Sequence, residues 1–117
     1  MPHNTCCNSR CRAYTLALDS MLSSAVYAAR AQRQYLADKN SHTARMARIR
    51  RGHYNTLFEL MLELGLDTDT TDIRLLETEI TNGRPESVER IRARLLAENA
   101  SEGAGDLQLG SSPVVHA

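Results

Sequence analysis

The sequence is poor in aromatic residues and has no long apolar segment. Four tyrosines and one phenylalanine stand beside no tryptophan. The most apolar stretch, residues 57–66, contains two glutamates and is well short of the roughly 20 apolar residues that cross a bilayer. The first residues also show no apolar core of a secretory signal. We therefore predict a cytoplasmic protein without a membrane-spanning segment.

Cysteine is confined to the beginning of the sequence, at Cys6, Cys7 and Cys11. An odd number of cysteines in one cluster does not make a disulfide framework, which favours a reducing compartment. Together with His3 these residues offer four zinc ligands, but structural zinc sites usually take ligand pairs from separate segments. We interpret them as exposed thiols in a tail and predict no metal and no other cofactor.

A catalytic signature is also missing. A cysteine nucleophile needs a base in a pocket, and His53 falls on an apolar helix stripe far along the chain from Cys11. The carboxylates between residues 59 and 72 fit solvated helix faces and helix N-termini, because a two-carboxylate mechanism requires a cleft. The sequence therefore predicts a protein that is not an enzyme.

The formal net charge is zero, which argues against a general binder of polyanions. The charges are separated along the chain, however. Residues 1–55 carry nine positive and two negative side chains, a net +7, and residues 56–117 carry five positive and twelve negative ones, a net −7. This separation predicts charge complementarity between the halves of one chain, between two copies, or with a partner.

The apolar spacing is helical throughout, and no β pattern is present. The second helix is expected to be capped by Ser41 and to end at Gly65. Pro85 fits the first position of the fourth helix, in which Glu86 and Arg90 are spaced for an ion pair. The predicted helices cover residues 10–38, 42–64, 72–81 and 85–99.

These helices predict an all-α fold with one domain over residues 10–99 and disordered tails at 1–9 and 100–117. The short link between the first two helices favours a long antiparallel hairpin. Two shorter C-terminal helices then fold over one end of it to form a small helical bundle. The core would be lean, and a homodimer that completes the bundle is slightly favoured over a monomer with a solvated hairpin end.

Each long helix carries an apolar stripe that is expected to face the core or a dimer interface. The stripe of the first helix has small alanines in the middle, which permits the close approach of a neighbour. Gly52 costs about 1 kcal/mol relative to alanine inside the second helix, so it marks a close contact or a bend. The stripe residues are Tyr14, Leu18, Met21, Ala25, Met46, Ile49, His53 and Leu57.

Five arginines are expected to gather near the tip of the hairpin. Such a patch binds phosphates or an acidic protein surface, or is simply a solvated helix face. Nucleic acid is the weakest of the three readings, because few aromatic side chains are available for base stacking. The arginines are Arg30, Arg33, Arg45, Arg48 and Arg51.

Taken as a whole, the sequence favours a non-enzymatic protein–protein interaction module. We expect a small regulator, adaptor or inhibitor of a larger protein, of the kind that bacteria and mobile elements encode. The alternative is a nucleic-acid-binding protein that uses the arginines of the hairpin tip.

Overall fold

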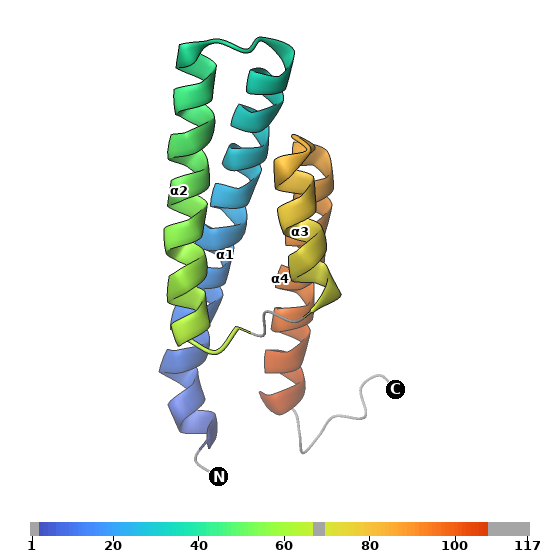
Figure 1. Ribbon diagram of the computed structural model, residues 1–117. Coiled ribbons are helices and arrows are strands. Elements are labelled where there is room, and N and C mark those ends of the chain that lie inside the picture. Colours follow the sequence, from blue (N-terminus) through green and yellow to red (C-terminus); the bar gives the residue numbers. More distant parts are fainter. Residues whose placement is uncertain (1–2, 67–69, 108–117) are drawn as a thin grey trace.

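The computed structural model describes the backbone of residues 3–66 and 70–107, and the side chains of residues 12–66 and 70–100. The helices are α1 (His3–Ala37), α2 (Ser41–Glu63), α3 (Thr71–Thr81) and α4 (Pro85–Leu107), with no strand in the described backbone. Consecutive helices run antiparallel and form two hairpins (Figure 1). The predicted all-α bundle is thus confirmed. No helix in these ranges is both long and apolar enough to cross a bilayer.

Two helices reach further than the sequence predicts. α1 begins at His3 and α4 ends at Leu107, so residues 3–9 and 100–107 are helical although they were expected to be tails. α1 contains no proline or glycine, and each residue added to a formed helix gains a hydrogen bond. α4 has 23 residues, as many as α2, and is not one of two short helices. The remainder of both predicted tails lies outside the described residues.

Local sequence signals define the helix ends. Asn40, and not Ser41, caps α2: its side-chain oxygen accepts the Thr43 backbone N–H at 2.9 Å. In return, Thr43 Oγ1 accepts the backbone N–H of Asn40 at 3.1 Å, which completes a capping box. Gly65 follows α2 with φ 104°, and Pro85 is the first residue of α4, both as predicted.

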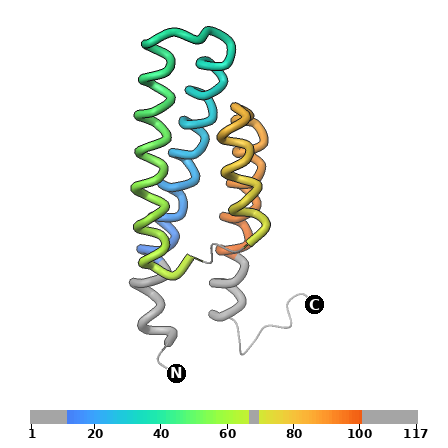
Figure 2. Tube along the Cα trace, in the orientation of Figure 1, coloured from blue at the N-terminus to red at the C-terminus, as the bar shows by residue number. Residues whose placement is uncertain are grey.

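α1 lies at the centre of the bundle, between α2 and the α3–α4 hairpin (Figure 2). Among the side chains that the structure describes, it supplies seven of the fourteen buried apolar ones, and three of these seven are alanines that let the neighbouring helices approach closely. Among the predicted stripe residues of α1, Leu18, Met21 and Ala25 are buried, and Tyr14 packs partly buried against the core. The predicted stripe of this helix thus lies in or against the core of the single chain.

α2 buries a face adjacent to the predicted one. Tyr54 and Met61 are buried, whereas Ile49 is 54% exposed and His53 is exposed, so these last two, predicted to face the core or a dimer interface, do not lie in the core of the single chain. The Tyr54 hydroxyl donates to Oε2 of Glu77 in α3 at 3.2 Å. The other two stripe residues of α2, Met46 and Leu57, are half-buried.

The α1–α2 hairpin extends past the turn that joins α3 to α4 (Figure 1). This turn lies beside Arg33, well before the end of α1, and Gly83 contacts the Arg33 backbone there. The C-terminal helices were expected to fold over one end of the long hairpin, but α4 follows α1 from Arg33 as far as Thr15, whose hydroxyl accepts from Asn99 at 2.8 Å. They therefore cover most of the hairpin and leave its tip free. The end of α1 and the start of α2 therefore project beyond the rest of the bundle.

Candidate interaction surfaces

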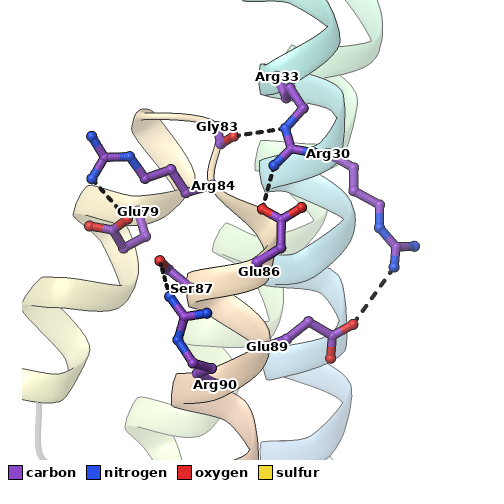
Figure 3. Close-up of polar contacts among 9 residues, drawn as sticks. All are labelled: Arg30, Arg33, Glu79, Gly83, Arg84, Glu86, Ser87, Glu89 and Arg90. Carbon is purple, nitrogen blue, oxygen red and sulfur yellow. Dashed lines mark hydrogen bonds and ion pairs between the residues drawn. The ribbon is translucent and has the colours of Figure 1, made fainter.

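Two of the five predicted tip arginines pair with carboxylates of α4 (Figure 3). Arg30 Nη2 lies 3.7 Å from Oε2 of Glu89. The Arg33 guanidinium donates to Glu86, and its Nε donates to the Gly83 carbonyl at 3.3 Å. The hydrogen bond from Arg33 lowers the pKa of the Glu86 carboxyl, and the Glu86 backbone N–H lowers it further. These arginines thus join α1 to the α3–α4 hairpin.

Two arginines of the α3–α4 hairpin are also occupied (Figure 3). Arg84 pairs with the buried Glu79 at 3.4 Å, and Arg90 donates to Oγ of Ser87 at 3.0 Å. The ion pair expected between Glu86 and Arg90 along α4 is not formed, because the Glu86 carboxylate turns toward α1. The opposite charges of the two chain halves therefore meet, in part, within one chain.

Arg51, the third predicted tip arginine, turns toward α3. Its Nη1 donates to Oγ1 of Thr81 at 3.4 Å, and its guanidinium lies 5.8 Å from the centre of the Tyr54 ring. This geometry lies within the range of a cation–π contact. Arg51 thus contributes to the contact between α2 and α3, and its guanidinium is not displayed at the tip.

Arg45 and Arg48 are the predicted tip arginines that stay unpaired. Both are exposed, and neither makes a hydrogen bond, ion pair or ring contact with any side chain that the structure describes. They lie on the first half of α2, which projects beyond the α3–α4 turn. Their charges are available to a partner.

A groove of about 560 Å³ opens between the two hairpins near the projecting end. The Tyr27 ring forms part of its wall, with the guanidinium groups of Arg30 and Arg50 at 5.5 and 5.4 Å from the ring centre. The sequence gives no sign of this pairing, because Arg50 lies away from the other arginines on the helical wheel. Glu86 and Glu89 of α4 also line the groove, so it is not uniformly positive.

The side of α2 that points away from α1 forms a second exposed surface. Ile49 and Leu60 are 54% and 43% exposed on it, and the exposed Gly52 and Thr56 lie between them. The Thr56 hydroxyl donates to the Gly52 carbonyl at 3.1 Å, so it is satisfied within the helix. We call this surface the outer face of α2; at 100° per residue it comprises Arg45, Ile49, Gly52, Thr56, Leu60 and Glu63.

No three potential metal ligands converge among the side chains of residues 12–66 and 70–100. The side chains of His3, Cys6, Cys7 and Cys11 fall outside these ranges. The interpretation of the cysteines as free thiols therefore stays a prediction.

Searches against protein-family models, curated proteins and solved structures find no match for this chain. Its function is therefore inferred from the two surfaces, the groove and the outer face of α2.

Proposed function

We propose that this chain is a non-enzymatic protein–protein interaction module, a small cytoplasmic regulator, adaptor or inhibitor of a larger protein. The observation that carries the proposal is the outer face of α2. This face exposes Ile49 and Leu60 in one row, with a charged residue at each end. Exposed apolar groups rimmed by charge are typical of protein interfaces.

The charges around this row indicate the kind of partner. Arg45 and Arg48 are unpaired, and the first half of α2 carries no acidic residue. An acidic surface on the partner would complement them, and such complementarity mainly raises the association rate and the specificity. The groove beside Tyr27, which displays both signs of charge, offers a further contact area.

Nucleic acid is the weaker alternative. Three of the five tip arginines are engaged inside the chain, and the carboxylates of Glu86 and Glu89 line the groove that Arg30 and Arg33 border. Two unpaired arginines neutralise few phosphates, so binding to DNA or RNA would be weak and would fall steeply with added salt. The experiment that tests the proposal must therefore distinguish binding to a protein from binding to nucleic acid.

Affinity capture from the native host, with and without nuclease, tests the proposal. The chain should retain a stoichiometric protein after nuclease treatment, and the double variant Ile49→Lys/Leu60→Lys should lose it. Leu75→Lys is the matched control, because Leu75 is 41% exposed but lies on α3. Loss of every captured protein on nuclease treatment, or equal capture by all variants, would contradict the proposal.

A further inference from the structure

We infer that the outer face of α2 binds the same face of a second copy of this chain, with the two α2 helices antiparallel. This inference rests on one part of the proposed function, namely that the outer face of α2 is an interaction surface. It adds the identity of the molecule that occupies this surface. Two independent features of α2 support it, one at the middle of the face and one at its ends.

Gly52 is the feature at the middle. It lies in the interior of α2, where glycine costs about 1 kcal/mol relative to alanine. A Cβ built on Gly52 has no atom within 4 Å, and its φ is not positive, so neither packing nor backbone geometry within the chain requires glycine. The absence of a side chain on an exposed helix face does permit the backbone of another helix to approach closely.

Thr56 extends this flat area by one helical turn. Because its hydroxyl is already bonded to the Gly52 carbonyl, Thr56 can turn its methyl group outward without leaving a donor unsatisfied. Gly52 and Thr56 thus form a small, level contact area at the centre of the outer face. Ile49 and Leu60 lie on either side of it, as the apolar flanks of a helix crossing.

The distribution of charge along α2 is the second feature. All four arginines of α2 lie between positions 45 and 51, and its glutamates are at 59 and 63. Arg45 and Glu63 are each nine positions from residue 54, the midpoint between Gly52 and Thr56. An antiparallel copy centred there brings Arg45 opposite Glu63 of the second copy, whereas a parallel copy brings like charges together.

The same register agrees with the other residues of the helix. Arg48 lies six positions before the midpoint and Glu59 lies five positions after it. Leu60 lies six positions after the midpoint and Ile49 lies five positions before it. Each copy therefore places Ile49 beside Leu60 of the other, and Arg48 beside Glu59 of the other. Two-fold symmetry repeats every one of these contacts, as is usual in homodimers.

This dimer uses the side of α2 that points away from α1. The groove between the hairpins is lined by α1 and α4 and by a different side of α2, which carries Met46 and Arg50. The groove stays open in the dimer and is available to a larger partner. A larger protein that binds the groove is therefore compatible with self-association, whereas one that binds the outer face of α2 competes with it.

Analytical ultracentrifugation of the purified full chain, over about 1–200 µM, tests the inference, because a single helix–helix contact is expected to give micromolar affinity. We expect a reversible monomer–dimer equilibrium. Gly52→Gln places a long side chain at the centre of the contact, and its Cβ has no atom of its own chain within 4 Å. It should weaken dimerisation at least about tenfold while the helical content is retained.

Charge reversal tests the register. Arg45→Glu should weaken the dimer about tenfold, because two attractive pairs become repulsive. The double variant Arg45→Glu/Glu63→Arg should restore it. Within one chain these positions are about 27 Å apart along α2, so the rescue reports a contact between copies. Arg74→Glu, on the exposed side of α3, is the control and should leave the equilibrium unchanged.

A chain that stays monomeric over the whole concentration range overturns the inference. So does a dimer that is insensitive to Gly52→Gln, or one that the double charge reversal does not restore. If the chain is monomeric and capture of a larger protein still depends on Ile49 and Leu60, the inference fails and the proposed function stands. If the dimer behaves as described and no larger protein is retained, the inference stands and the proposed function fails.

Discussion

Gly83, in the turn between α3 and α4, lies directly against the backbone of Arg33 in α1. A Cβ at Gly83 would be 2.9 Å from both the N and the Cα atom of Arg33. The Gly83 carbonyl also accepts a hydrogen bond from Arg33 Nε at 3.3 Å. This contact fixes how far along α1 the second hairpin docks, and so how much of the first hairpin projects.

Substitution of Gly83 by alanine should therefore be strongly destabilising. The new methyl group would overlap the Arg33 backbone, and φ of 68° is unfavourable for alanine. We expect a loss of roughly 3 kcal/mol in the free energy of unfolding by urea denaturation. Gly65→Ala is the control, since φ is 104° there but nothing lies within 4 Å, and about 1–2 kcal/mol should be lost. Equal losses for the two variants would mean that the Arg33 contact is unimportant.

Substitution of Gly52 by alanine should instead raise the free energy of unfolding. Gly52 is in the interior of α2, and a Cβ there meets no other atom. Alanine has the higher helix propensity, so the free energy of unfolding in dilute solution should rise by about 1 kcal/mol. Thermal unfolding followed by circular dichroism gives the measurement. A lower melting temperature for this variant would show that Gly52 has a structural role inside the chain.

The helix ends show how much of the fold is predictable from the sequence. Gly65 and Pro85 stand where backbone geometry requires them, so local rules locate the end of α2 and the start of α4. The sequence does not decide which face of α2 is buried in the single chain, because two apolar stripes lie side by side on this helix. Packing against α1, and the contact of Tyr54 with Glu77, decide between them.

The arginine patch illustrates a different limit. The sequence correctly indicates excess positive charge near the hairpin tip, but Arg30 and Arg33 pair with acids of α4 more than 50 positions away. Which helix lies beside α1 is a property of the topology, and no local pattern reveals it. Arg45 and Arg48 remain candidates because no other helix covers their side of α2.

Shortening an apolar side chain of α1 should lower the free energy of unfolding substantially only where that side chain is buried. Leu22 in α1 is fully buried, whereas Leu16 in the same helix is 64% exposed. Leu22→Ala should lower the free energy of unfolding by about 2–5 kcal/mol, through lost apolar contact and the cavity that remains. Leu16→Ala should change it by less than about 0.5 kcal/mol. Urea denaturation of both variants checks this contrast, and similar losses would place Leu16 in an interface.

The Glu86 carboxyl should titrate below its ordinary range. The hydrogen bond from Arg33 lowers its pKa first, and the Glu86 backbone N–H adds to the effect. Carbon-detected NMR titration should show the pKa rising toward the ordinary value of about 4.3 in Arg33→Gln. Arg90→Gln should raise it less, because Arg90 donates to Ser87. An unchanged Glu86 titration in Arg33→Gln would mean that the ion pair is absent in solution.

Tyr54 should make the fold sensitive to alkaline pH. Burial raises the pKa of the Tyr54 hydroxyl, and the charge of Glu77 and the hydrogen bond to it raise it further, against a smaller opposing effect of Arg51. Above the ordinary tyrosine pKa of about 10, the unfolded chain releases this proton while the folded chain holds it. The free energy of unfolding should therefore be unaffected by Tyr54 below this pH, and should fall by up to about 1.4 kcal/mol per pH unit above it.

Tyr54→Phe isolates this contribution. At neutral pH the variant should be less stable by about 1 kcal/mol, because it lacks the hydrogen bond to Glu77. As the pH rises above about 10, the wild-type chain should lose stability faster than the variant, so the difference between them shrinks and then reverses sign. Urea denaturation over a pH series measures both curves. Parallel curves up to the most alkaline pH would show that the Tyr54 hydroxyl is not shielded from solvent beside Glu77.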